Sequence, residues 1–439
     1  MRIFSLQLDN FRGFKHIAIN LEGKSAVFFG INGVGKTSIL RAVDLIYANF
    51  IGSILQTKKR LAELNEDDIF DNSLFAKAEV VFLSNDKTKY SYWRKIDRDG
   101  KRTHGKPVLK AMVDDFTREY LGEIDEGQNG EEYFRESNAF MPIFVNYGVN
   151  RLVLETPLVN DNSKYEKKNA FDNAIESKID FKSFFSWFKY KEDLENEILA
   201  RSNFEYFGSV PAKPDDLQAV RIAMLSMFPE FKNVRVDRKL NTFILEKNGE
   251  VLNINQLSDG EKCTMALFGD IARRMSIANN GHLENPLLGD GVVLIDEVDL
   301  HLHPSWQRKI VGILRRTFPN IQFILTTHSP QVLGGVDKDF SVFSIDRMDG
   351  DVIVEKHDSL YGWDSNIILE EAMGTSRVNN EVLQHIERMY QAYDADDLKT
   401  ASEESDWIDI NTSGHNDCVS GMRVMISRKR RMLENAKNQ

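Results

Sequence analysis

The stretch GINGVGKTS, residues 30–38, decides the fold of this chain. It fits the pattern G-x-x-x-x-G-K-[ST], and it lies between the apolar run SAVFF and a run with helical spacing. Glycines in such a loop let the backbone wrap a phosphate group, and the N–H groups at the start of the helix face the anion. We therefore predict a strand, a phosphate-binding loop and a helix in this order. The predicted binding residues are Asn32, Gly33, Gly35, Lys36, Thr37 and Ser38.

Two side chains of this loop predict the ligands. Lys36 has the position from which an ammonium group reaches the β- and γ-phosphate oxygens, and the hydroxyl of Thr37 has the position that holds Mg²⁺. A chance glycine-rich turn would not need a strand before it and a helix after it. The expected cofactors are ATP and Mg²⁺.

The second motif is VVLIDEVDLHLHP, residues 292–304, where an apolar strand ends in two acidic residues. Asp296 at the end of a buried strand is a candidate ligand of Mg²⁺, and Glu297 is a candidate base for the attacking water. An apolar strand followed by Asp-Glu is common, so the assignment depends on the phosphate-binding loop. His301 and His303 could bind a metal, but no further ligand follows at a zinc-like spacing. Asp299 fits a loop at a dimer interface better.

A third motif is ILTTHSP, residues 324–330, in which His328 follows a second apolar strand. A lone histidine at a strand end is often only a polar terminus. Near a phosphate-binding loop, its imidazole can instead donate a hydrogen bond to the γ-phosphate. We predict that His328 takes part in catalysis.

The fourth motif is LSDGEK, residues 257–262. On its own it indicates a helix N-cap with acidic residues in the first turn. The order of the four motifs, however, resembles ATP-binding cassette (ABC) ATPases, whose signature loop reads LSGGQ. The resemblance implies that Ser258 and Gly260 close over the γ-phosphate held by a second copy. Asp259 and Glu261 depart from the family pattern.

The string FRGF, residues 11–14, narrows the resemblance to the SMC, RecF and OLD-like branch, in which an arginine placed like Arg12 lies near the nucleotide. A surface turn is the alternative for Arg12. The 439 residues contain neither the long coiled coil of SMC proteins nor the acidic pattern of a Toprim domain after the TTHS strand. The chain resembles the PtuA-type ATPases of Septu anti-phage systems.

That resemblance implies a function and partners. ATP would dimerise the heads head to head within a homo-oligomer, and the ATPase would regulate an HNH nuclease and reach DNA only through the complex. No nuclease activity of the chain itself is expected. The alternatives are the ATPase scaffold of a PARIS-like system with a Toprim effector, and a RecF-like DNA-repair ATPase.

The fold class expected is α/β: an ABC-ATPase head with a mixed sheet, a parallel core sheet that carries the phosphate-binding loop, a helical insertion and a helical C-terminal extension. The predicted regions are an N-terminal ATPase lobe with a β meander, a helical insertion, a C-terminal ATPase lobe, and an extension with a tail. Their bounds are 1–150, 151–235, 236–358 and 359–439.

Two finer expectations concern segments outside the motifs. Residues 110–138 show helical spacing that loosens around Gly127–Gly130. From residue 400 an acidic block and a basic block surround a few large apolar residues, which favours docking to a partner over core formation.

Composition limits the remaining possibilities. The formal net charge of −11 argues against DNA binding by the whole surface. Two cysteines, Cys263 and Cys418, do not make a disulfide framework and favour a reducing compartment. No apolar run approaches the roughly 20 residues that cross a bilayer. A cytoplasmic protein without a membrane partner is expected.

Overall fold

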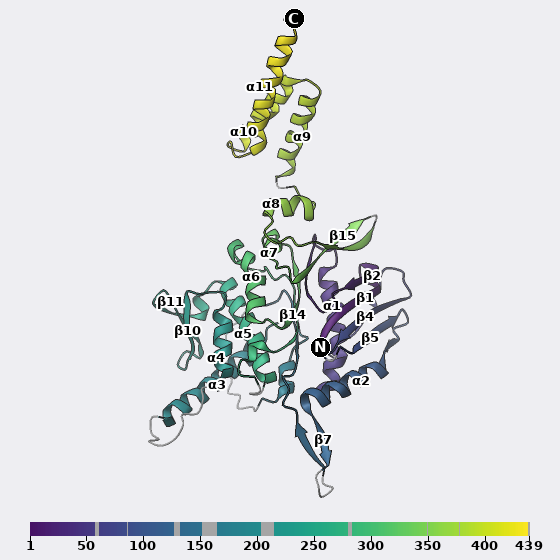
Figure 1. Ribbon diagram of the computed structural model, residues 1–439, viewed down its shortest axis with the longest axis vertical. Helices are drawn as coiled ribbons and strands as arrows, with labels where there is room; N and C mark the ends of the chain where they lie inside the picture. The colour runs from purple at the N-terminus through teal and green to yellow at the C-terminus, as the bar shows by residue number, and fades with distance from the viewer. Residues whose placement is uncertain are drawn as a thin grey trace. The chain divides into compact units, whose positions relative to one another are not determined.

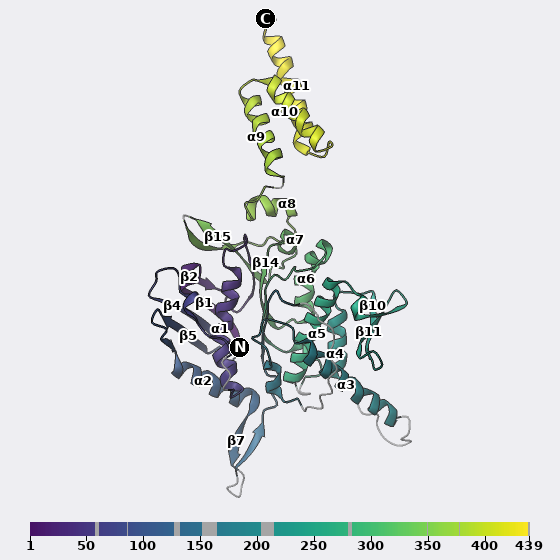
Figure 2. The same cartoon turned by 180° about the vertical axis from the view of Figure 1, so that it is seen from behind.

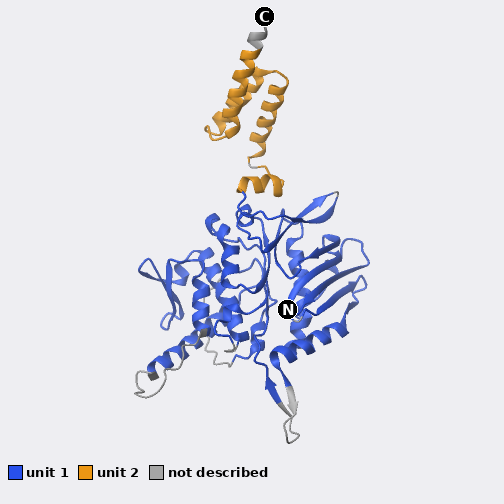
Figure 3. Cartoon of the chain, viewed as in Figure 1, with its two compact units in different colours: residues 1–363 blue, residues 364–439 orange. Residues whose placement is uncertain are grey.

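The computed structural model describes residues 1–57, 61–85, 87–126, 132–151, 165–202, 215–279, 283–348, 350–376 and 378–437. The chain divides into two compact units, Met1–Trp363 and Asp364–Gln439 (Figure 3). The motifs at residues 30–38, 257–262, 292–304 and 324–330 all lie in the first unit.

A six-stranded sheet of order β16-β15-β3-β14-β13-β9 forms the core of the first unit (Figure 1). The strands β9, β13, β14, β3 and β15 run parallel, and β16 is antiparallel to β15. Every residue of β3, β9, β13 and β14 is buried, as the mostly apolar strands of a covered parallel sheet require. The strands are Ser25–Phe29 (β3), Ile143–Tyr147 (β9), Gly291–Ile295 (β13), Ile321–Thr327 (β14), Phe340–Met348 (β15) and Asp351–His357 (β16).

A second sheet, of order β2-β1-β4-β5-β6, is antiparallel throughout. Its strands are Arg2–Phe11 (β1), Phe14–Asn20 (β2), Phe75–Leu83 (β4), Lys89–Asp97 (β5) and Arg102–His104 (β6). Helix α1 (Lys36–Ile54) contacts β4 and β5 of this sheet and β9 and β14 of the core sheet. It is therefore enclosed between the two sheets, which accounts for the burial of most of its residues. The predicted α/β class, with a parallel core sheet that carries the phosphate-binding loop, is confirmed.

The described residues between β9 and β13 are mostly helical. It contains η3 (Lys167–Phe171), α3 (Phe181–Ser202), α4 (Asp215–Leu225) and α5 (Asp259–Asn279), together with a small antiparallel sheet. That sheet consists of β10 (Phe231–Asp237), β11 (Thr242–Lys247) and β12 (Glu250–Asn253), followed by η4 (Ile254–Gln256). Seen from behind, α3, α4, α5 and β10 lie together on the side of the core sheet away from β1 (Figure 2). Helix α5 packs against α3, α4 and η3 and is buried along nearly its whole length.

The prediction of a helix over 110–138 is only partly right. Helix α2 (Lys106–Phe116) and the turn η2 (Thr117–Leu121) are followed by a hairpin, β7 (Gly122–Glu126) and β8 (Glu132–Glu136). Gly122 ends the helical part because its φ of 137° is a conformation that other residues rarely adopt. A Cβ at this position would also come within 2.3 Å of the Arg135 carbonyl oxygen.

The first unit also contains η1 (Glu66–Asp68), η5 (Pro286–Leu288), α6 (Pro304–Thr317) and α7 (Pro330–Gly334). The side chain of His303 caps α6, since Nδ1 lies 3.3 Å from the backbone N–H of Ser305 and 2.9 Å from its hydroxyl. Among the helices in the described parts of the chain, none combines the length and apolar character needed to span a membrane.

The second unit contains α8 (Ser365–Ile367), η6 (Ile368–Ala372), α9 (Asn380–Asp394), α10 (Leu398–Asn411) and α11 (Asp417–Lys437). The helices α9, α10 and α11 share one apolar core, so the prediction that the chain from residue 400 does not form a core is wrong. Spacings of three and four residues place the apolar side chains of each helix on one face. The buried members are Val382, Met389, Leu398, Ala401, Ile408, Val419, Met422 and Ile426.

Candidate nucleotide site

The phosphate-binding loop joins β3 to α1, with Asn32, Gly33 and Thr37 exposed and Ser38 half-buried. Two glycines are required here by close approach as well as by conformation. At Gly30, with φ 150°, a Cβ would lie 2.2 Å from the Ile345 carbonyl oxygen, and at Gly35, with φ 119°, it would lie 2.7 Å from the Phe14 ring. The loop therefore curls tightly against β15 and β2, and its backbone remains open toward solvent.

The ammonium group of Lys36 lies inside the loop. Its Nζ donates to the carbonyl oxygens of Gly30 and Ile31, each at 2.8 Å. Burial lowers the pKa of Lys36 to about 8, although the carboxylates of Asp296 and Glu297 act in the opposite sense. Lys36 Nζ also lies 3.3 Å from Nδ1 of His328. A buried ammonium group that these neutral groups hold is well placed to gain an anionic partner.

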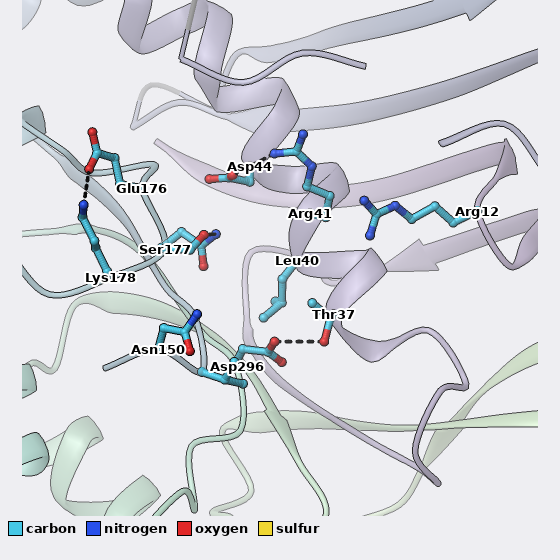
Figure 4. A pocket seen from close by; sticks show the side chains of 13 residues that line it. Arg12, Thr37, Leu40, Arg41, Asp44, Asn150, Glu176, Ser177, Lys178 and Asp296 are labelled. Atoms are coloured by element: carbon cyan, nitrogen blue, oxygen red, sulfur yellow. Dashed lines mark hydrogen bonds and ion pairs between the residues drawn. The ribbon is translucent and has the colours of Figure 1, made fainter. Parts of the chain in front are cut away.

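Thr37 meets Asp296 across the site. The Thr37 hydroxyl donates to Oδ2 of Asp296 at 2.9 Å (Figure 4). The Thr326 hydroxyl donates to Oδ1 of Asp296 at 2.5 Å. A hydroxyl and a carboxylate are hard oxygen donors of the kind that Mg²⁺ prefers. The donor set at this point therefore fits the Mg²⁺ expected from the sequence, and Thr37 and Asp296 are the residues that would hold it.

Glu297 follows Asp296 in the left-handed region, with φ 48°. Its N–H donates to the Thr326 hydroxyl at 2.8 Å, and its carbonyl oxygen accepts from the N–H of Leu300 at 2.9 Å and from Nη2 of Arg151 at 2.6 Å. The backbone of this residue is thus held from three directions. The side chain is about one third exposed and remains accessible to water.

His328 lies between Glu297 and Lys36. Its Nε2 is 3.9 Å from Oε1 of Glu297, and its Nδ1 is 3.3 Å from Nζ of Lys36. Burial and the neighbouring ammonium group of Lys36 lower the pKa of His328. A neutral imidazole that accepts from Lys36 at Nδ1 would carry its proton on Nε2, the nitrogen nearer to Glu297.

A cavity of about 310 Å³ lies beside the Thr37–Asp296 pair (Figure 4). Arg12 lines it from the turn after β1, where φ is 51°, and donates through Nε to Oδ1 of Asp68 at 2.7 Å. Asn146 and Asn150 also line this cavity. Arg12 therefore lies beside the Thr37–Asp296 pair, and its proximity to a bound nucleotide stays a prediction.

The signature stretch forms an N-cap. The hydroxyl of Ser258 donates to Oε2 of Glu261 at 2.8 Å, and the Glu261 N–H approaches the same hydroxyl at 3.3 Å. Lys247 holds the other oxygen of Glu261 at 2.8 Å. Gly260 packs against the loop after Glu297, since a Cβ there would lie 2.3 Å from the His301 carbonyl oxygen. Neither Ser258 nor Gly260 lines the cavity beside Thr37 in its own chain.

Sequence reasoning missed three residues of this site. Thr326 and Thr327 each hold an acidic residue of the 292–304 motif, Thr327 through a 2.5 Å hydrogen bond to Asp299. The TTHS string contained a signal for them, because successive strand residues point to opposite faces and can meet two different partners. Nothing in the local pattern indicated that Arg151 reaches Glu297, which is 146 residues away.

Known proteins similar to this chain were found at the level of family models, relatives and solved structures. Residues 148–334 match a family model described as "AAA domain, putative AbiEii toxin, Type IV TA system", and residues 5–205 match one described as "AAA domain". The chain is 30% identical to "Retron Ec83 probable ATPase" of Escherichia coli, over 77% of this chain and 70% of the relative. It is 22% identical to "Septu protein PtuA" of Bacillus thuringiensis, over 98% of this chain and 99% of the relative. A solved SMC head domain from Thermotoga maritima covers 82% of this chain and matches in full, at 16% identity and a TM-score of 0.45.

Proposed function

Because this chain belongs to the family of ABC-type ATPases that includes the retron Ec83 probable ATPase, we propose that two copies close head to head on ATP and that hydrolysis reopens them. One observation carries the proposal. Ser258 and Gly260 lie apart from the cavity beside Thr37 and Asp296 in the same chain. A site with only half of its γ-phosphate contacts is completed when a second copy supplies the rest.

The chemistry follows from the placement of the side chains. The carboxylate of Glu297 would take a proton from water as the water oxygen bonds to the γ-phosphorus and the bond to the β-phosphate oxygen breaks, releasing ADP. Lys36 and the Nε2 proton of His328 would stabilise charge on the γ-phosphate oxygens. Thr37 and Asp296 would hold Mg²⁺, which when bound neutralises charge on the β- and γ-phosphates. Arg12 would add positive charge at the edge of the site.

The partner is inferred from the resemblance to the Septu ATPase. Its match to this chain covers nearly the whole of both proteins, including the C-terminal unit. That extent supports a defence function in which the nucleotide state of this ATPase regulates a partner HNH nuclease. DNA would be engaged through the complex, in keeping with the net charge of −11.

The closure is tested with Glu297→Gln. The amide cannot accept the water proton, so this variant should bind ATP, fail to hydrolyse it and accumulate as a closed dimer. Light scattering with and without ATP and Mg²⁺ measures the change in mass. Lys36→Ala provides the control, because a protein that cannot hold the phosphates should not respond. An ATP-independent mass for Glu297→Gln would contradict head-to-head closure.

The partner is tested by co-expression with the products of neighbouring genes. An HNH protein that co-purifies, and whose DNA cleavage changes in the Glu297→Gln background, supports the Septu-like function. A Toprim protein in its place supports the PARIS-like alternative. Salt-dependent DNA binding by the ATPase alone would instead favour a RecF-like function.

A further inference from the structure

Arg151 is a buried arginine next to the general-base candidate. It follows β9 by four residues and is 4% exposed. Its Nη2 donates to the Glu297 carbonyl oxygen at 2.6 Å, whereas its Nη1 is buried and meets no hydrogen-bond partner among the described residues. Removing a guanidinium group from water costs free energy, so the contact with Glu297 is expected to serve a purpose that offsets this cost.

The conformation of Glu297 provides that reason. A glutamate with φ 48° occupies a sparsely populated backbone region, and such a residue persists only where its surroundings hold it there. Thr326 accepts from its N–H, while Arg151 and the N–H of Leu300 share its carbonyl oxygen. Of these contacts, the one with Arg151 is the only one that comes from outside the sheet edge formed by β13, β14 and the turn itself.

Arg151 also contacts helix α5, here called the signature helix because it begins within the LSDGEK stretch. The thiol of Cys263, in the second turn of α5, donates to the Arg151 carbonyl oxygen at 3.3 Å. Gly260, in the first turn of the same helix, packs against the carbonyl oxygen of His301. The N-terminal end of α5 therefore contacts the Glu297 turn by two routes, one through Arg151 and one through the loop that follows.

Electrostatics agrees with this arrangement. Burial lowers the pKa of Arg151, and nearby acidic groups, including Asp296 and Asp299, oppose that shift. The guanidinium group therefore lies in the field of the acidic cluster of the 292–304 motif. It can hold the Glu297 backbone without forming an ion pair with the carboxylate, which leaves that carboxylate available to water.

We propose that Arg151 is a positioning residue for hydrolysis: it fixes the turn that aims the Glu297 carboxylate, and through Cys263 it ties that turn to the signature helix of its own chain. The proposal rests on the role of Glu297 in the proposed function. It implies that, when Ser258 and Gly260 move on contact with a second copy, the position of the Glu297 carboxylate in the same chain changes as well.

The first experiment compares Arg151→Met with Arg151→Lys in the full-length protein. Methionine has a similar apolar stem but donates no hydrogen bond, whereas lysine can still reach one carbonyl oxygen. Arg151→Met should lower kcat on the order of 100-fold, because a small misplacement of a catalytic group has about that effect, and should leave the Kd for ATP within about twofold. Arg151→Lys should recover part of the loss. A purely structural role would give no such split between kcat and Kd.

Arg94→Met is the matched control. Arg94 is 6% exposed, and its Nη1 donates to the carbonyl oxygens of Leu45 and Ala62 away from the motif. The variant Arg94→Met should lower thermal stability about as much as Arg151→Met does, while its kcat per folded molecule stays near the parent value. Equal loss of kcat in both variants would show that Arg151 serves only the fold.

The second experiment tests the link to the helix. Cys263→Ala should lower kcat severalfold in the parent protein. Cys263→Ser keeps a hydrogen-bond donor and should have a kcat near that of the parent. In the Arg151→Met background, Cys263→Ala should have little further effect. If the two substitutions instead lower kcat independently, so that their factors multiply in the double variant, Cys263 and Arg151 are not coupled. Glu297→Gln distinguishes a failure of the proposed base from a failure of the proposed positioning role. If it hydrolyses ATP normally, the proposed base is wrong; if it is inactive while Arg151→Met retains parental kcat, only the positioning role of Arg151 is wrong.

Discussion

The hydroxyl of Thr326 donates a 2.5 Å hydrogen bond to Oδ1 of Asp296, and the same hydroxyl accepts from the N–H of Glu297 at 2.8 Å. One side chain of β14 thus orients the two acidic residues that end β13. Because Oδ1 is engaged in this way, Oδ2 of Asp296 faces Thr37. The parallel pairing of β13 with β14 brings the acidic and threonine motifs to the same edge of the sheet, although they are about 30 residues apart in sequence.

Replacing Thr326 with valine should therefore impair hydrolysis without abolishing the fold. The two side chains have nearly the same shape, but valine leaves a buried carboxylate oxygen and an N–H group without their partner, at a cost of about 1–3 kcal/mol each. We expect kcat to fall at least tenfold and the apparent Mg²⁺ requirement to rise in a magnesium titration of the ATPase rate. Thr326→Ser keeps the hydroxyl and should stay close to the parent. Unchanged kcat in Thr326→Val would show that the bond does not orient Asp296.

Lys36→Ala should weaken ATP binding on the order of 10- to 100-fold, because the phosphates lose a charge-assisted hydrogen bond in a partly dry site. Calorimetric titration with ATP and Mg²⁺ measures the change. Lys309→Ala, at an exposed position of α6, is the control and should bind like the parent. Equal affinity in the Lys36 variant would remove this loop from the nucleotide site.

The parts of the fold that the sequence predicts well are those in which a motif and its secondary structure occupy the same few residues. SAVFF, GVVLI and IQFILTT are mostly apolar because both faces of the parallel sheet are covered, so they are recognisable as β3, β13 and β14. The glycines of the loop before Lys36 could be identified for the same reason. Each is needed locally, by φ or by a close backbone contact.

The parts that could not be predicted depend on distant partners. The acidic and basic blocks after residue 400 have the sequence pattern of solvated surfaces that face no other element. In the structure, however, Arg423 on α11 forms ion pairs with Asp406 at 2.8 Å and Asp409 at 2.9 Å on α10. Trp407 is half-buried and stacks on the His385 ring with centroids 3.4 Å apart. These pairs exist only once α9, α10 and α11 are assembled. The contact of Arg151 with Glu297 was missed for the same reason.

Ser258→Arg should stop hydrolysis while each subunit still binds ATP, since the defect lies on the surface that closes over a second copy. Combined with Glu297→Gln, it should prevent the ATP-dependent rise in mass expected of that variant in light scattering. Ser258→Thr keeps both the hydroxyl and the helix cap, so it should still allow the Glu297→Gln dimer to form. If the Ser258→Arg, Glu297→Gln double variant dimerises on ATP, the signature stretch does not act across an interface.

Asp44, on α1 beside the cavity, should make stability depend on pH. It is 1% exposed, and burial raises its pKa to about 7, which Arg41 only partly offsets. Between about pH 4 and pH 7 the folded state therefore keeps a proton that the unfolded state releases. The contribution of this group to the free energy of unfolding falls as pH rises through that window and is constant above it.

Asp44→Asn removes this titration, so its stability relative to the parent should grow from about pH 5 to about pH 8 by up to about 3 kcal/mol. Urea unfolding of both proteins at the two pH values measures the difference. Parallel pH dependence of the two proteins would mean that Asp44 titrates normally in the folded state.

The second unit should unfold without loss of the nucleotide site, because its apolar core is drawn from α9, α10 and α11 alone. Ile408 and Ile410 on α10 offer a matched pair, since the first is fully buried in that core and the second is 77% exposed. Ile408→Asp places an unpaired charge in the core and should cost several kcal/mol, whereas Ile410→Asp should change stability by at most about 0.5 kcal/mol. Limited proteolysis should then cleave the region after Trp363 in Ile408→Asp only, and calorimetry should give parental ATP affinity for both variants. Weakened ATP binding in Ile408→Asp would show that the two units depend on each other for the nucleotide site.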